Sequence, residues 1–64
     1  MRALAKIRKG KGYTLDRLSR ETSIAKSHIN NFEHEKVGIS PEGLLRIAKV
    51  LRTTVEEISR IELD

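Results

Sequence analysis

The chain has 64 residues with 13 Lys or Arg against nine Asp or Glu, a formal net charge of +4, and no cysteine. This length limits it to one domain, and the missing cysteines exclude disulfides, a thiol nucleophile and cysteine-bound zinc. No apolar run approaches the roughly 20 residues of a membrane span, the N-terminus lacks the apolar core of a signal peptide, and the two histidines match no metal spacing. We therefore expect a cytoplasmic protein without a cofactor.

The charges are unevenly distributed along the chain. Residues 1–36 hold nine Lys or Arg against four acids, whereas residues 37–64 hold four against five. From Thr54 onward there is one arginine against four acids. A basic N-terminal part favours a polyanionic partner, although an ordinary solvated surface accounts for the charge alone equally well.

The first two predicted helices are defined by apolar spacing and by glycine. Apolar residues three apart in ALAKIRK predict an amphipathic helix over residues 2 to about 10, which a pair of glycines ends. Thr14 is suited to cap a second helix that runs to about Glu21 and buries Leu15 and Leu18. A short turn at Thr22-Ser23 follows.

The third predicted helix starts near Ala25 and carries Ile29 and Phe32. On a helical wheel of about 100° per residue these three side chains share one side, which we expect to face the core. Residues 35–39 then form a loop that contains Gly38.

The last two helices have clear start signals. Ser40 is followed by a proline and an acid, and apolar residues continue at helical spacing to about residue 51. Thr54 and Glu57 form a capping-box pattern that opens a fifth helix, with Ile58 and also Ile61 expected inward.

No segment alternates with period two for long enough to predict a strand. The fold class is therefore all-α, a small five-helix orthogonal bundle. A small residue, Ser19, falls where two crossing helices would touch, and Ser23 occupies the tight turn between them. This pattern predicts a helix-turn-helix at about residues 15–34 within a single domain, residues 1–64.

The outward side of the third helix is unusually rich in neutral hydrogen-bonding side chains. It collects Ser27, Asn30, Asn31 and His34, whereas a helix face kept only for solubility favours Glu, Lys and Ala. An asparagine amide presents a donor and an acceptor together, which suits an adenine edge in the DNA major groove. Any one of these residues could instead be plain surface, but the whole face together with the turn pattern favours nucleic acid.

The sequence resembles the lambda-repressor-like (Xre, phage Cro-C1 type) helix-turn-helix family over nearly its whole length. The resemblance is carried by three stretches in the right order and spacing: LAKIRKGKGYTLDRLS, SIAKSHINNFEHEK and SPEGLLRIAKVLRTTVEEI. It implies a dimeric repressor that reads double-stranded DNA. The sequence departs from the family at Leu15, where glutamine is usual, at Ser23, where glycine is usual, and at Ala25, where a capping Ser or Thr is usual.

The resemblance also implies roles for individual residues. Lys26, Ser27 and Asn31 fall at base-reading positions, with His28 and Asn30 near the backbone or flanking bases. A structural ion pair is implied between Arg8, late in the first helix, and Glu33, which closes the third. Phosphate contacts are expected from Thr14, Arg17, His34, Lys36 and Lys11, with Arg2 and Lys9 as further candidates.

A homodimer interface is expected at the C-terminal end, through Ile58, Ile61 and Leu63, and a frayed tail is the alternative. The acidic C-terminus also leaves room for a protein partner, so an antitoxin or anti-repressor type of interaction module is the alternative function. An enzyme is disfavoured because no convergent titratable groups can be assembled. The chain could also be the DNA-binding part of a longer regulator.

Overall fold

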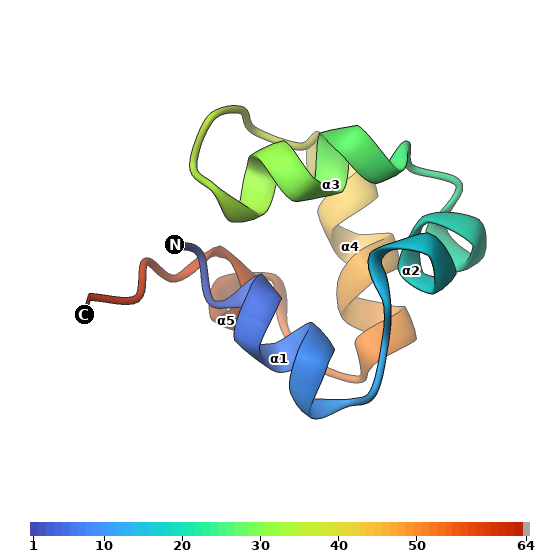
Figure 1. The fold of residues 1–64 in the computed structure, drawn as a ribbon, viewed down its shortest axis with the longest axis horizontal. Coiled ribbons are helices and arrows are strands. Elements are labelled where there is room, and N and C mark those ends of the chain that lie inside the picture. The colour runs from blue at the N-terminus through green and yellow to red at the C-terminus, as the bar shows by residue number, and fades with distance from the viewer. Residues whose placement is uncertain (64) are drawn as a thin grey trace.

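The computed structural model describes residues 1–63, and these form the predicted all-α bundle (Figure 1). The five helices are α1 (Leu4–Gly10), α2 (Leu15–Thr22), α3 (Lys26–Glu33), α4 (Pro41–Leu51) and α5 (Val55–Ser59). The helix α1 begins at Leu4 and not at residue 2, because Arg2 is held in an extended pairing described below. The other helix starts lie within one residue of those predicted.

Three of the helices begin with the hydroxyl caps that the sequence predicts. The Oγ atoms of Thr14, Ser40 and Thr54 each accept a hydrogen bond from the backbone N–H three residues later, at 3.1, 3.2 and 3.1 Å. Pro41 occupies the first turn of α4, where its missing N–H costs nothing. Such caps satisfy N–H groups that would otherwise have no partner within the helix.

The helix α3 begins without a side-chain cap, because Ala25 occupies that position. The expectation that Ala25 faces the core is wrong. Its backbone is extended, with ψ 137°, and its side chain is exposed, so the helical wheel does not apply to it. Ile29 and Phe32 are buried as predicted.

A single apolar core joins the helices. The helix α2 packs against α3 and α4, and α5 packs against α1 and α4, so that α3 lies along one outer side of the bundle (Figure 1). The side chains that fill this core are Leu4, Leu18, Ile24, Ile29, Phe32, Ile47, Ala48, Leu51 and Ile58. Leu15 is only partly buried, but it packs against the same core.

The two ends of the described chain lie side by side (Figure 1) and pair as a short antiparallel bridge between Arg2 and Ile61. The N–H of Ala3 donates to the carbonyl of Arg60 at 2.7 Å, and the N–H of Glu62 donates to the carbonyl of Met1 at 2.8 Å. This pairing turns Ile61 outward, with 43% of its surface exposed, so the expectation that it faces the core is wrong.

The turn between α2 and α3 contains a residue in the left-handed conformation. Ser23 is left-handed, with φ 60° and ψ 27°, and its N–H donates to the carbonyl of Ser19 to close α2. This is the conformation that glycine adopts most easily. Glu35 and Arg52 are also left-handed, with φ 62° and 56°. Across residues 1–63, no helix has both the length and the apolar character needed to cross a membrane.

Candidate nucleic-acid interface

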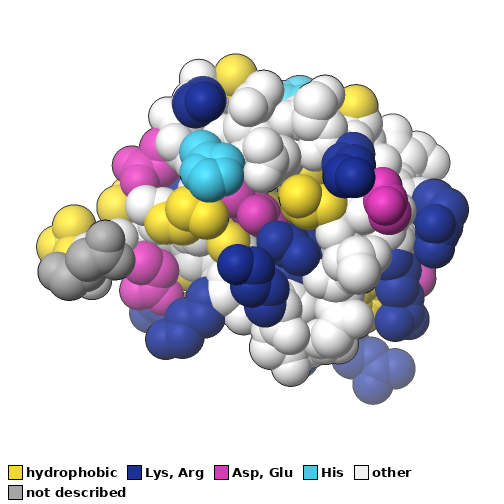
Figure 2. All heavy atoms as spheres, in the orientation of Figure 1, with side chains coloured by type: hydrophobic (Ala, Val, Ile, Leu, Met, Phe, Trp, Pro, Cys, Tyr) yellow, Lys and Arg dark blue, Asp and Glu magenta, His cyan; other side chains and the backbone are white. Residues whose placement is uncertain are grey.

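The outward side of α3 forms a mainly uncharged polar surface. Lys26, Ser27 and His28 are exposed in its first turn, and Asn30 and Asn31 are partly exposed one turn later. In Figure 2 the face over α3 is mostly white, with a few dark-blue (Lys or Arg), cyan (His) and yellow (hydrophobic) side chains. All five predicted base-reading residues therefore lie on one helix and reach the solvent.

Lys26 is not free at the tip of this helix. Its ammonium lies 3.1 Å from the carboxylate of Asp16, which belongs to the first turn of α2. Both side chains are largely exposed, at 56% and 64%. The ion pair therefore spans the two helices of the helix-turn-helix. The sequence does not predict it, because the two residues meet only through the tertiary fold.

His28 is tied to the loop that follows α3. Its Nε2 lies 2.9 Å from the carbonyl oxygen of Gly38, and because a carbonyl can only accept, this nitrogen donates. The bond holds the imidazole toward the loop 35–39, while Ser27 and Asn31 have no side-chain hydrogen bond within the described residues. Ser27, Asn31 and the similarly placed Asn30 are thus the members of this surface most available to an external partner.

The predicted phosphate-contacting residues fall into two groups. Thr14 and Arg17 have internal partners: the Thr14 hydroxyl caps α2, and Arg17 Nε donates to Glu21 at 2.8 Å while the guanidinium lies 4.0 Å from the Tyr13 ring centroid. The hydrogen bond with Glu21 raises the pKa of Arg17, and the same bond lowers the pKa of Glu21.

The second group has no internal partner. Lys11, His34 and Lys36 are exposed, and within residues 1–63 none of them takes part in an ion pair or a side-chain hydrogen bond. His34 and Lys36 directly follow α3, so they flank the C-terminal end of the polar surface. Lys11 lies in the turn after α1.

Arg2, a further candidate for phosphate binding, packs against an aromatic side chain of α3. Its guanidinium lies 4.2 Å from the centroid of the Phe32 ring, and its Nε is buried without a hydrogen-bond partner among the described atoms. The half-buried side chain thus packs on Phe32 near the C-terminal end of α3. Arg2 therefore has a packing role, and its phosphate contact stays a prediction.

Beneath α3 lies the ion pair between Arg8 and Glu33. Arg8 Nε and Nη2 donate to the two carboxylate oxygens of Glu33 at 2.8 and 3.2 Å, and Arg8 Nη1 donates to the carbonyl of Tyr13 at 2.9 Å. Arg8 is 7% exposed and Glu33 1%. This bidentate ion pair joins the last residue of α3 to α1 and so fixes how α3 lies on the bundle.

The expected dimer residues differ in exposure. Ile58 is 0% exposed and belongs to the core, so its assignment to a dimer interface is wrong. Ile61 and Leu63 are 43% and 90% exposed. Asp64, the last acid of the C-terminal end, lies outside the described residues.

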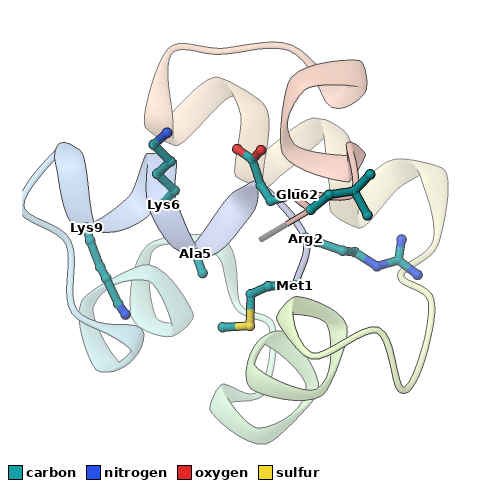
Figure 3. Close-up of a pocket in the computed structure, with 7 residues that line it drawn as sticks. Met1, Arg2, Ala5, Lys6, Lys9 and Glu62 are labelled. Atoms are coloured by element: carbon teal, nitrogen blue, oxygen red, sulfur yellow. The ribbon is translucent and has the colours of Figure 1, made fainter.

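A shallow hollow of about 440 Å³ lies beside the chain ends, lined by α1 and the two terminal segments (Figure 3). None of the outward polar residues of α3 lines it. Its lining residues are Met1, Arg2, Ala5, Lys6, Lys9, Glu62 and Leu63. The hollow is therefore separate from the candidate interface.

Comparison with known proteins gives two matches and one negative result. A family model described as a helix-turn-helix domain matches residues 1–58. The solution structure of the N-terminal DNA-binding domain of SinR, the master biofilm regulator from Bacillus subtilis, is similar with a TM-score of 0.77 and 25% sequence identity, over 100% of this chain and 97% of that one. No curated protein matches the sequence.

Proposed function

Because the chain belongs to the helix-turn-helix family, of the lambda-repressor-like (Xre) type, we propose that it is a transcriptional regulator that binds double-stranded DNA in a sequence-dependent way. The observation that carries the proposal is the exposed amide and hydroxyl surface of α3, presented by the second helix of the helix-turn-helix. In this motif the second helix lies in the major groove, and its N-terminal residues contact base edges. Residues 1–64 act as one DNA-binding unit in this proposal.

The base-reading residues of the proposal are those on the outward side of α3. Asn31 and Ser27 are accessible and without internal partners, and an asparagine amide pairs in two places with adenine. Lys26 provides a donor for guanine once it leaves Asp16. His28 and Asn30 contact flanking bases or the backbone. For His28 the reason is its bond to Gly38, which turns the imidazole toward the loop.

Phosphate contacts supply most of the affinity in this proposal, as they do for DNA-binding proteins in general. Lys36 and His34 flank one end of α3, and Lys11 lies after α1; all three are exposed and unpaired within residues 1–63. Thr14 and Arg17 lie at the N-terminal end of α2 and contribute from there. Arg17 must leave Glu21 to do so, which costs little because both side chains are largely exposed, at 49% and 40%.

The regulator acts as a dimer on a near-palindromic operator and represses transcription by occupying it. Adjacent half-sites are about 34–36 Å apart, and the longest extent of this chain is 29 Å. One copy is therefore shorter than the half-site spacing, which leaves room for two copies on adjacent half-sites. Ile61 and Leu63 are the exposed apolar residues that we assign to the contact between the copies.

Selection of bound sites from random duplex DNA tests this function. The bound pool should converge on a consensus with two-fold symmetry at a stated salt concentration of about 0.1 M, because non-specific binding weakens steeply with salt. A pool that stays random, or no binding at all, contradicts the proposal. A consensus without symmetry supports sequence reading but contradicts the dimer.

A further inference from the structure

We propose that Asp16 is a specificity-determining residue: by holding the ammonium of Lys26, it keeps that lysine from binding DNA phosphates indiscriminately. The inference rests on the proposed function and adds to it a residue that makes no expected DNA contact. It is carried by the 3.1 Å ion pair between the first turns of α2 and α3.

The position of the pair is the first step of the argument. Lys26 is the first residue of α3, and Asp16 is the second residue of α2, so the carboxylate lies at the same end of the motif as the base-reading surface. Asp16 is 64% exposed and has no other ion-pair partner among residues 1–63. The carboxylate is therefore placed to hold the Lys26 ammonium away from the phosphates of DNA that approaches α3.

The strength of the pair is the second step. Lys26 and Asp16 are both more than half exposed, and such pairs contribute little to folding stability. The pair can therefore open without disturbing the fold. Asp16 can therefore compete with DNA acceptors for the Lys26 ammonium. The pair does not stabilise the fold as the buried pair of Arg8 and Glu33 does.

The flexibility of lysine is the third step. A free lysine carries a point charge on a four-carbon stem and reaches many phosphates equally well. With Asp16 present, the Lys26 ammonium is biased toward the first turn of α2, so it reaches fewer phosphates and passes to a base acceptor that competes with the carboxylate. Removing the carboxylate therefore helps binding to every sequence, but it helps the correct site least, because there the gain is offset by the loss of this positioning.

The test compares Asp16→Asn with the unchanged chain on two probes. One is the best duplex recovered by selection, and the other is a mixed-sequence duplex pool of the same length, about 30 base pairs. The variant should bind the pool about three- to ten-fold more tightly, and the salt slope on the pool should steepen by about one. Its affinity for the selected duplex should rise less, so the specificity ratio falls.

Two further variants separate this mechanism from a general effect of charge. Glu42→Gln removes the same charge from an exposed, ion-paired acid on α4 and should leave the specificity ratio unchanged. In a Lys26→Met background, Asp16→Asn should lose most of its effect on pool binding. Thermal unfolding of each variant, followed by circular dichroism, checks that the fold is kept.

The outcomes distinguish the inference from the proposed function. If the unchanged chain does not discriminate between the two probes, the proposed function fails and this inference fails with it. If the unchanged chain discriminates but Asp16→Asn keeps the full ratio, only the inference is overturned. An equal effect of Asp16→Asn with and without Lys26 also overturns it, because the carboxylate then acts by repulsion alone.

Discussion

Arg8 and Glu33 lie 25 positions apart in the chain and form a buried bidentate ion pair, with donor–acceptor distances of 2.8 and 3.2 Å. Burial makes removing either partner expensive, because the other is left charged and without its counter-ion. We therefore expect Arg8→Met to lower the free energy of unfolding by about 3–5 kcal/mol. Total stabilities of about 0.05–0.15 kcal/mol per residue are usual, about 3–10 kcal/mol for 64 residues, so this variant should lose a large share of its stability.

Urea unfolding followed by circular dichroism measures the effect of Arg8→Met. The control is Arg46→Met, which removes the arginine of an exposed i,i+4 pair with Glu42 and should cost at most about 0.5 kcal/mol. The double variant Arg8→Met/Glu33→Leu should recover most of the loss, because no charge is then left buried. A loss of unfolding free energy below about 1 kcal/mol in the single variant would show that the Arg8–Glu33 pair behaves as a surface ion pair.

Local signals in the sequence were sufficient for most of the fold. The caps at Thr14, Ser40 and Thr54 depend only on a hydroxyl and a backbone N–H three residues away, so each could be placed from the sequence. The pairing of Arg2 with Ile61 could not, because it depends on where two distant chain segments arrive after the bundle has formed. Helical periodicity accordingly places Ile61 inward, although α5 ends before it.

The same distinction holds for the candidate interface. The outward residues of α3 follow from its periodicity, and the bond between Arg17 and Glu21 follows from an i,i+4 spacing that is visible in the sequence. The pairing of Lys26 with Asp16 carries no such spacing. This pair depends on how α2 and α3 cross, and no fixed spacing of residues in the sequence indicates that crossing.

The left-handed turn residue Ser23 offers a way to stabilise the fold. The left-handed conformation costs residues other than glycine about 1–2 kcal/mol. Replacing Ser23 by glycine removes this cost, but the greater freedom of glycine in the unfolded chain offsets part of the gain. Ser23→Gly should therefore raise the free energy of unfolding by about 0.5–1 kcal/mol in urea titrations. The exposed position of Ser23 means that little packing is lost.

A matched control for Ser23→Gly exists at Gly38. That glycine is not left-handed, and an added Cβ would meet nothing within 4 Å. Gly38→Ala should therefore be neutral or stabilising by up to about 1 kcal/mol. A destabilised Ser23→Gly variant would show that the flexibility of glycine outweighs the relief of strain at this turn.

The bond between Arg17 and Glu21 should be visible in the titration of Glu21. The guanidinium lowers the pKa of this carboxyl below the ordinary 4.5, so the pair stabilises the fold above that pH. The contribution is lost as the pH falls through the lowered pKa, when the carboxylate takes up a proton. Arg17→Gln should move the pKa of Glu21 back toward 4.5, measured from carboxyl carbon shifts by NMR.

Glu35 serves as an internal control in the same titration. Its pKa is lowered by the hydrogen bond from the N-terminal ammonium, a partner that Arg17→Gln does not touch. The pKa of Glu35 should therefore stay low in the variant. If the pKa of Glu21 is unchanged by the substitution, its hydrogen bond to Arg17 is not formed in solution.

The exposed apolar side chain of Ile61 should contribute to self-association. Ile61→Asp places a charge where two copies would bury apolar surface, so it should weaken association in sedimentation experiments at several concentrations. Leu45→Asp is the control, because Leu45 is equally apolar and 51% exposed but lies on α4. Equal association of Ile61→Asp and the unchanged chain would remove this surface from the proposed dimer.

Asn31 is expected to carry discrimination between base pairs and little of the overall affinity. Asn31→Ala should lose about 1–3 kcal/mol of discrimination at one base pair of the selected site, because a two-point contact to a base edge disappears. The measurement is competition binding of the selected duplex against single-substitution variants of it. Retention of the full specificity ratio would show that Asn31 does not read a base.

Lys36→Ala provides the contrasting result. Lys36 is exposed after the end of α3 and unpaired within residues 1–63, so its loss should weaken binding to every sequence alike. The dependence of log affinity on log salt should become shallower by about one, since one fewer counter-ion is released. An unchanged slope would exclude Lys36 from the phosphate contacts, and a change confined to one base pair would assign it to base reading instead.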